Sequence, residues 1–458
     1  MDLTASNFGK DFKWGVSTAA YQIEGGWDIE GKGNSIWDTF SNSKGKTFKG
    51  QNGNIACDYF NRYSQDLAII HRLKIPNYRF SLSWSRILPN GTGAVNKKGI
   101  DFYNRVIDFC IEQSIVPWIT LYHWDLPDEL EKRGGWTNRE IINWFGHYVE
   151  LCVRCFGDRV KHWMILNEPM VFTGAGYFLG VHAPGRKGLN NFLAATHHAA
   201  MCQAEGGRIV RSMSTEARIG TTFSCSYIQA YNDSIRDEMA AQRVDALLNR
   251  MFVEPLVGLG YPVNELYFLR RLEPYIKDGD ESKLVFDMDF IGVQNYTREL
   301  VTSSWFTPFV WAKIIKADKR NVETTVMNWE IYPESLYKML LKFSKYEKFK
   351  EIVVTESGAA FSDIVINGSV NDEKRKIYIE EQIKQVLQAR QDGVNVNGYF
   401  VWSLTDNFEW AEGYHPRFGL VYINYFTQER IIKDSGYWYS RFVQSTMNSI
   451  AIKHSLSI

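Results

Sequence analysis

Runs of apolar, β-branched and aromatic residues recur along the chain, and each is followed by a polar turn and a stretch with helical apolar spacing. The strand-like runs number eight and occupy residues 12–21, 77–84, 116–124, 162–169, 218–227, 289–296, 351–357 and 396–404. Helices are predicted between them at residues 59–73, 99–114, 138–156, 191–213, 334–346 and 373–391. This alternation predicts an α/β fold in which parallel strands close into a (β/α)8 TIM barrel.

An open, doubly wound sheet is the structural alternative. Eight strands are many for such a sheet, and no glycine-rich dinucleotide-binding turn follows the first run. No linker rich in Pro, Gly or Ser and no block of like charges divides the chain. We therefore expect residues 1–458 to form a single domain.

Side chains capable of chemistry follow the C-terminal ends of the predicted strands. They are Gln22, Arg79, His123, Glu168, Tyr296, Glu356 and Glu409. In a (β/α)8 barrel these strand ends meet at one face, which is where active sites lie. The pattern therefore predicts a site at the C-terminal ends of the strands.

The charge, the apolar runs and the cysteines of the sequence argue against several kinds of protein. Lys plus Arg and Asp plus Glu number 52 each, and no basic block occurs, so nothing in the charge favours binding to nucleic acid or an anionic membrane. No run of 18 apolar residues is present, and the first residues lack the features of a secretory signal. Among six cysteines only Cys152 and Cys155 are close, on a predicted helix, and we expect them to face the core rather than hold a metal. These features predict a cytoplasmic protein.

Two glutamates are candidates for acid–base and nucleophilic chemistry. Glu168 follows an apolar run at the expected barrel mouth, where desolvation would raise its pKa and suit it to be a general acid; alternatively it is a helix-start acid ahead of Pro169. Glu356 has Arg79 as a plausible neighbour, whose charge would lower the pKa of the carboxyl and keep it ionised; alternatively the two form a structural ion pair. Paired carboxyls with different pKa values are what glycoside hydrolysis requires. The small residues 357–360 would leave room for a sugar ring, and 15 Trp offer flat faces for stacking one.

Six sequence motifs carry a resemblance to a known protein family. They are "AAYQIEG", "YRFSLSWSRI", "YHWDLP", "LNEP", "TESG" and "VWSLTDNFEWAEGYHPRFGLVYIN", in this order between about residues 8 and 445. Together they resemble the family 1 glycoside hydrolases, the β-glucosidase family. The resemblance implies a retaining exo-β-glycosidase, a β-glucosidase that acts on terminal β-D-glucosyl residues through a covalent glycosyl-enzyme. It also implies no metal or organic cofactor, because the acid and the nucleophile are both side chains.

The resemblance also implies a role for each matching residue. Glu168 matches the acid/base and Glu356 the nucleophile, which Arg79 and Tyr296 would orient and stabilise. The residues that would bind substrate are Gln22, His123, Trp124, Asn167, Gln294, Tyr296, Trp329, Trp402, Glu409, Trp410 and Phe418. Taken singly, His123 could instead be a core histidine and the "NFEW" segment a packed turn.

The chain departs from the family pattern at two places. Ser357 follows the nucleophile where Asn is usual, so local hydrogen bonding is expected to differ there. In "GVQNYT" an alignment without a gap puts Gln294 at the position of the usual Asn and Tyr296 at that of the Tyr which contacts the nucleophile. If the alignment shifts by one residue, Asn295 takes the role of Gln294.

The expected partners are small β-glucosides and short cello-oligosaccharides, with side activity on β-galactosides and β-fucosides and some transglycosylation. Glu409 would repel the phosphate of a 6-phosphosugar. Leaving-group preference is expected to depend on the loops around Trp329 and residues 177–181, and the protein to be a monomer or a homo-oligomer. An alternative function is a catalytically inactive sugar-binding protein on the same barrel, but such relatives typically lose one carboxylate and this chain keeps both.

Overall fold

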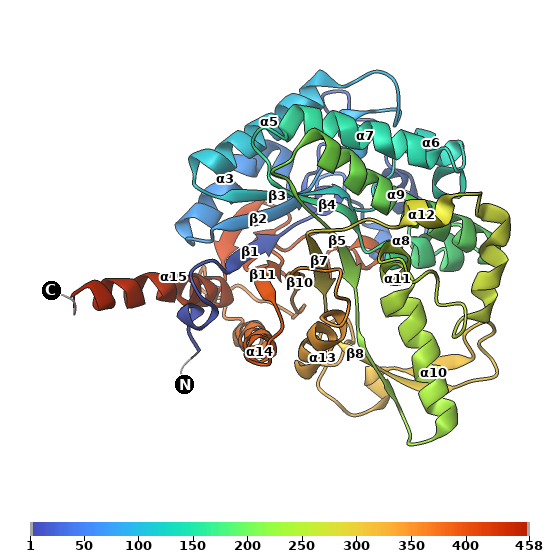
Figure 1. Cartoon of the computed structure of the whole chain (residues 1–458). Coiled ribbons are helices and arrows are strands. Elements are labelled where there is room, and N and C mark those ends of the chain that lie inside the picture. Colours follow the sequence, from blue (N-terminus) through green and yellow to red (C-terminus); the bar gives the residue numbers. More distant parts are fainter. Residues whose placement is uncertain (1–2, 456–458) are drawn as a thin grey trace.

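Eight parallel strands form a closed barrel at the centre of the molecule (Figure 1). The computed structural model describes residues 3–455, and side chains for residues 3–445. The barrel strands are β1 (Lys13–Ser17), β2 (Asn77–Ser81), β3 (Val116–Tyr122), β4 (His162–Asn167), β5 (Arg218–Ser224), β7 (Phe290–Gln294), β10 (Ile352–Ser357) and β11 (Val396–Trp402). Each pairs with its neighbours in the order β1-β11-β10-β7-β5-β4-β3-β2, and β2 pairs with β1 to close the barrel. The predicted (β/α)8 barrel is confirmed, and the alternative of an open sheet is wrong.

The first predicted strand, 12–21, is too long. β1 ends at Ser17, where its pairing with β2 ends opposite Arg79. The chain then turns, and the Ala20 amide donates to Ser81 Oγ over 2.7 Å at the start of the short helix α1 (Ala20–Ile23). This turn carries Gln22 over the mouth of the barrel.

Long helices surround the barrel (Figure 1) because each has one apolar face to bury against the strands. They are α3 (Tyr59–Arg72), α5 (Lys97–Glu112), α7 (Ile141–Phe156), α9 (Leu189–Met213), α13 (Glu334–Phe343), α14 (Glu373–Gln391) and α15 (Asp434–Ser455). The six predicted helices correspond to the first six of these, and α15 has no counterpart in the prediction.

Large side chains fill the inside of the barrel. Trp118, Met164, Phe290, Val353 and Phe400 form one buried cluster, separate from the core between strands and helices. The Trp118 ring lies 5.7 Å from Phe290 and 5.0 Å from Phe400 between ring centroids, although their strands are not neighbours. Such contacts across the barrel fill its interior, so it is a packed core and not a pore.

Other segments extend the loops at the C-terminal ends of the strands. A three-stranded side sheet consists of β6 (Tyr227–Ala230), β8 (Arg298–Ser303) and β9 (Ala312–Ile315) and packs on α10 (Ile235–Asp245), at the lower right of Figure 1. A hairpin of β12 (Val421–Asn424) and β13 (Glu429–Ile432) follows the last barrel strand. The sequence pattern predicted neither.

Short helices and helical turns occupy the remaining connections. The α-helices are α2 (Ile36–Ser41), α4 (Trp84–Ile87), α6 (Asp128–Lys132), α8 (Pro169–Thr173), α11 (Val253–Leu256) and α12 (Asp280–Leu284). The 3-10 and π turns are η1 (Ala5–Phe8), η2 (Phe48–Gly50), η3 (Gly135–Thr137), η4 (Gly174–Leu179), η5 (Ala246–Arg250), η6 (Tyr267–Tyr275), η7 (Ala317–Lys319) and η8 (Trp410–Glu412).

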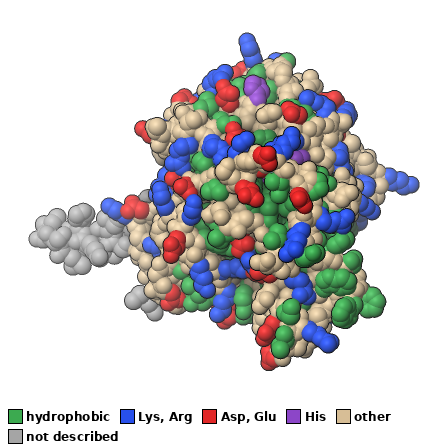
Figure 2. All heavy atoms as spheres, turned by 45° about the vertical axis from the view of Figure 1, so that its right-hand side comes forward, with side chains coloured by type: hydrophobic (Ala, Val, Ile, Leu, Met, Phe, Trp, Pro, Cys, Tyr) green, Lys and Arg blue, Asp and Glu red, His purple; other side chains and the backbone are tan. Residues whose placement is uncertain are grey.

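Surface and cysteine chemistry add little to the functional picture. Basic and acidic side chains are interspersed over the face shown in Figure 2. Across residues 3–455, no helix has the length and apolar character needed to cross a membrane, and no cluster of three or more His, Cys, Asp or Glu could hold a metal ion. All six cysteines are free; Cys152 is buried in the core as predicted, whereas Cys155 is only half-buried. The cytoplasmic location stays a prediction.

Candidate active site

A cavity of about 360 Å³ opens at the C-terminal ends of the barrel strands. Its size suits a small ligand. The predicted site residues that line it are Gln22, His123, Trp124, Glu168, Tyr296, Trp329, Glu356, Trp402, Glu409, Trp410 and Phe418. Arg79, Asn167 and Gln294 lie behind them, fully or almost fully buried, and contact the lining residues. The structure therefore gathers side chains from all parts of the chain around one cavity.

The Glu356 carboxylate, near the end of β10, is held by side chains from two other strand ends. Arg79 of β2 pairs with its Oε1 atom, and the Tyr296 hydroxyl donates to its Oε2 atom over 2.7 Å. Arg79 Nε is itself fixed by a 3.0 Å hydrogen bond to Thr120 Oγ1. Both carboxylate oxygens thus face fixed donors, which orients the group.

Asn167, the last residue of β4, is the centre of a hydrogen-bond cluster. Its Oδ1 atom accepts from Arg79 Nη2 (2.5 Å), Thr222 Oγ1 (2.8 Å) and Gln294 Nε2 (2.8 Å). Its Nδ2 atom lies 3.0 Å from Nε2 of His123, whose pKa is lowered by burial and by the charge of Arg79. Neutral His123 then accepts at Nε2 and carries its proton on Nδ1, a buried atom with no partner in the described chain. That proton is available to a ligand hydroxyl.

The pKa values of the two catalytic candidates are shifted to different extents. Burial, reinforced by the charge of Glu356, raises the pKa of Glu168 well above its usual range. Burial also raises the pKa of Glu356, but Arg79 and Tyr296 oppose that rise. The expected lowering of the Glu356 pKa by Arg79 is thus outweighed by desolvation. Because the rise is larger at Glu168, this carboxyl holds a proton while Glu356 is ionised.

The opposite end of the cavity presents hydrogen-bonding groups. Gln22 Nε2 donates to Asn407 Oδ1 and the Phe408 carbonyl oxygen, both over 3.0 Å, and more weakly to Glu409 Oε2 at 3.3 Å. Gln22 Oε1 is buried and has no partner among the described residues. Burial and the charge of Glu356 raise the pKa of Glu409 to about 8, so near neutral pH it both donates and accepts. These groups can bind the hydroxyls of one sugar ring.

Aromatic rings form the walls of the cavity. The Trp124 and Trp410 rings lie 4.7 Å apart, and the Trp402 ring is nearly parallel to that of His123 at 6.1 Å. At the other side Trp329 lies 5.2 Å from Tyr296. Flat apolar faces beside hydroxyl-binding groups match the two faces of a sugar.

Three lining residues have left-handed backbone conformations. The φ angles are 78° at Trp124, 46° at Glu168 and 49° at Trp410. Such angles are uncommon for residues other than glycine and cost free energy, so the surrounding structure must impose them. The strain coincides with the residues that face the cavity.

The small residues after Glu356 have another role than the one predicted. They do not line the cavity. A Cβ atom on Gly358 would lie 1.8 Å from the Trp402 carbonyl oxygen, so glycine is needed for the close approach of the two strand ends. Ser357 is fully buried with its hydroxyl beside the phenols of Tyr378 and Tyr399. The departure from the family pattern at Ser357 therefore lies outside the cavity.

Gln294 and Asn295, the two candidate amides of "GVQNYT", have different surroundings. Gln294 contacts Asn167, behind the cavity wall. Asn295 is directed elsewhere, because its Nδ2 atom donates to the Cys225 carbonyl oxygen and to Ser335 Oγ, both over 2.9 Å. Gln294, rather than Asn295, is therefore the amide that reaches Asn167.

Several lining residues have no counterpart in the sequence prediction. Ser224 ends the barrel strand β5, Glu299 lies in the side sheet, and His182 and Met327 lie in loops. No local pattern marks the last three, whereas Ser224 lies within the predicted strand 218–227 and was not singled out. Conversely, Tyr177 of the predicted leaving-group loop is buried, and its hydroxyl donates to Glu131 over 2.6 Å. None of residues 177–181 is among the lining residues, and the neighbouring His182 lines the cavity instead.

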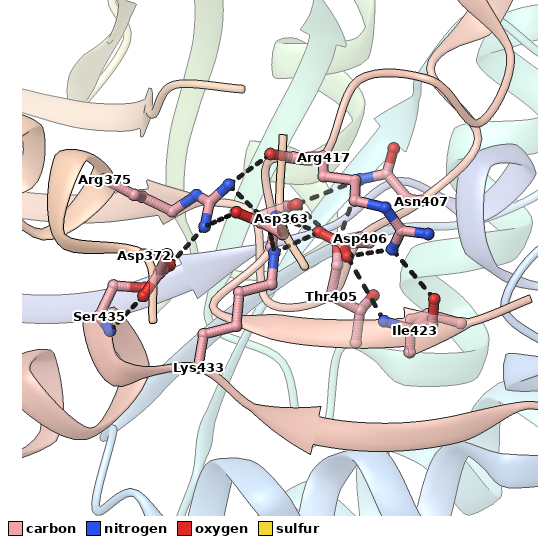
Figure 3. A network of polar contacts seen from close by, with 12 residues as sticks. Asp363, Asp372, Arg375, Thr405, Asp406, Asn407, Arg417, Ile423, Lys433 and Ser435 are labelled. Carbon is pink, nitrogen blue, oxygen red and sulfur yellow. Dashed lines mark hydrogen bonds and ion pairs between the residues drawn. The ribbon is translucent and has the colours of Figure 1, made fainter. Parts of the chain in front are cut away.

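A buried ion network supports the loops that carry Glu409 and Phe418 (Figure 3). It contains three carboxylates and three cations, namely Asp363, Asp372, Asp406, Arg375, Arg417 and Lys433. Lys433 Nζ contacts Asp363 and lies 2.6 Å from Asp406 Oδ1. Asp406 also accepts from the Gly419 amide over 3.0 Å, which fixes the chain next to Phe418.

We expect Lys433→Met to destabilise the fold by about 3–5 kcal/mol, because Asp363 and Asp406 would remain buried without this cation. Urea unfolding followed by tryptophan fluorescence would measure the change. Lys374→Met is the matched control, since the Lys374 side chain is 70% exposed and its ion pair with Glu323 should contribute within about 1 kcal/mol. Equal losses in the two variants would contradict the prediction.

Known proteins resemble this chain over nearly its whole length. A family model described as "Glycosyl hydrolase family 1" matches residues 4–448. A 1,4-beta-D-glucan glucohydrolase of Thermotoga neapolitana is 44% identical over 96% of this chain and 98% of its own length. Beta-glucosidase A of Thermotoga maritima is 43% identical over 97% and 99%. A solved structure of beta-glucosidase from Thermotoga maritima in complex with deoxynojirimycin aligns with a TM-score of 0.93 at 43% identity, covering 96% of this chain and 99% of that one.

Proposed function

Because the chain belongs to glycosyl hydrolase family 1 and is a glycoside hydrolase, we propose that it is a retaining β-glucosidase with one catalytic domain over residues 1–458. It removes the terminal non-reducing β-D-glucosyl residue from short glucans and from aryl or alkyl glucosides. The observation that carries the proposal is the pair of buried carboxyls, one with the higher pKa and one held by Arg79 and Tyr296. The names of the relatives support glucosides as the substrates.

In the first step, Glu356 attacks the anomeric carbon while protonated Glu168 gives its proton to the glycosidic oxygen. The leaving group departs as an alcohol, and the sugar is bonded to Glu356 Oε. In the second step Glu168, now ionised, takes a proton from water, and the water oxygen displaces Glu356. Two inversions at the same carbon retain the β configuration. An acceptor alcohol in place of water would give transglycosylation.

The sugar before the cleaved bond is proposed to lie between Gln22, Glu409 and His123, with Trp402 beneath it. The unpartnered Gln22 Oε1 and His123 Nδ1 atoms support this position, because a bound sugar hydroxyl would satisfy each of them. A 4-hydroxyl in either configuration can meet these groups, so β-galactosides and β-fucosides are proposed as secondary substrates. The inactive sugar-binding alternative has no support, since both carboxyls line the cavity.

A panel of nitrophenyl glycosides would test this function. We expect turnover of the β-glucoside, slower turnover of the β-galactoside and β-fucoside, and none of the α-glucoside. Proton NMR at early times should show β-glucose before mutarotation produces the α anomer. Absence of turnover on all the β-glycosides would refute the proposed activity, and α-glucose as the first product would refute retention.

A further inference from the structure

A second hollow adjoins the catalytic cavity beside Trp329. This hollow, of about 270 Å³, lies between β8, η7 and residues 327–330. Four residues line both spaces and form the boundary between them, namely Thr297, Glu299, Met327 and Trp329. A ligand that extends from the catalytic cavity toward this hollow therefore meets Glu299.

The Glu299 carboxylate has no partner in the described part of the chain. No hydrogen bond or ion pair reaches it, although two arginines are near. Glu330 binds both of them, because it accepts from Arg298 Nε (2.9 Å) and Nη2 (2.8 Å) and from Arg320 Nη1 (2.6 Å). The two arginines near Glu299 are thus already engaged by Glu330.

Glu299 is only partly buried, and its carboxylate is free to accept a hydrogen bond from a ligand. Burial, opposed by Arg320 and reinforced by Glu330, raises the pKa of Glu299 to about 7. The group therefore lies between its neutral and charged forms near neutral pH, and in either form it accepts a hydrogen bond. The hydroxyl of a bound ligand would satisfy it.

The charge of the second hollow favours an uncharged ligand. Its lining carries three cations and three carboxylates, namely Arg298, Lys316, Arg320, Glu299, Asp318 and Glu330. Beside Glu299 stands the Trp329 ring, so a carboxylate and an indole occur together, as Glu409 and Trp410 do at the opposite end. Neutral sugar rings bind to this combination of groups.

We propose that Glu299 determines leaving-group specificity, by accepting hydrogen bonds from the hydroxyls of a leaving sugar that lies against Trp329. The ligand class is the second glucosyl unit of a short β-glucan. An aryl leaving group reaches Trp329 but offers no hydroxyl to Glu299. The inference rests on the proposed β-glucosidase function.

The test compares two substrates in the full chain. Glu299→Leu removes the acceptor, and Glu299→Gln keeps its size and one acceptor oxygen. We expect kcat/KM for cellobiose to fall about 10- to 100-fold in Glu299→Leu and by less in Glu299→Gln, because a hydrogen bond to a charged or polar group is lost. For nitrophenyl β-glucoside, kcat/KM should stay within twofold of the unchanged enzyme. Glu347→Leu, at an exposed site, is the matched control for both substrates.

Two results would overturn the inference: an unchanged cellobiose value in both variants, or a parallel loss on both substrates in Glu299→Gln. If Glu299→Leu does not fold, the comparison of the two substrates in Glu299→Gln alone tests the inference. Failure of the proposed function gives a different result, because the unchanged enzyme would then not hydrolyse nitrophenyl β-glucoside.

Discussion

Replacing Glu356 with glycine is expected to reduce hydrolysis of nitrophenyl β-glucoside by about 10⁵-fold or more, the order of loss when a catalytic nucleophile is removed. No other carboxylate of the cavity is held by Arg79 and Tyr296 in this way. Steady-state release of nitrophenolate measures the loss. Glu347→Gly, at an exposed site, controls for the substitution itself.

Azide distinguishes a lost nucleophile from a damaged fold. The space left by the Glu356 carboxylate should admit azide, which would attack the anomeric carbon of dinitrophenyl β-glucoside from the same side. A single inversion would then give the α-glucosyl azide. Activity above a hundredth of the original in Glu356→Gly, without azide, would refute the assignment of the nucleophile.

Replacing Glu168 with glutamine is expected to have an effect that depends on the leaving group. For cellobiose, whose leaving alcohol needs a proton, kcat/KM should fall about 10²- to 10⁴-fold. For dinitrophenyl β-glucoside it should change little, because dinitrophenolate leaves without a proton. Equal losses on both substrates would contradict the role of Glu168 as general acid.

The pH dependence of kcat/KM checks the same role. The proposed mechanism requires protonated Glu168 and ionised Glu356. Since burial and Glu356 raise the pKa of Glu168, activity should persist through neutral pH and fall as pH rises through that pKa. It should also fall at low pH as Glu356 takes up a proton. In Glu168→Gln the loss at high pH should disappear, because an amide does not titrate.

Local sequence predicted the barrel because its signals are short-range. The run 351–357, which contains Glu356, has apolar β-formers on both faces, as parallel strands buried on both sides require. The helix predicted over 99–114 has its apolar residues on one face, and the structure has it at Lys97–Glu112. The predicted ends of strands were less accurate where a turn follows, as after Ser17. A strand ends where its pairing with a neighbouring strand ends, and the local sequence does not contain that information.

The apolar pattern was enough to predict the eight barrel strands, and the motifs were enough to predict the set of side chains at their ends. How these side chains act on one another depends on the folded chain. Whether Gln294 or Asn295 faces Asn167 depends on packing against Cys225 and Ser335. The pKa of Glu356 depends on burial that outweighs Arg79, and Glu299 is unpaired because Glu330 engages both arginines. The ionisation, burial and hydrogen-bond partners of these side chains depend on residues far apart in the chain, so no local sequence pattern predicts them.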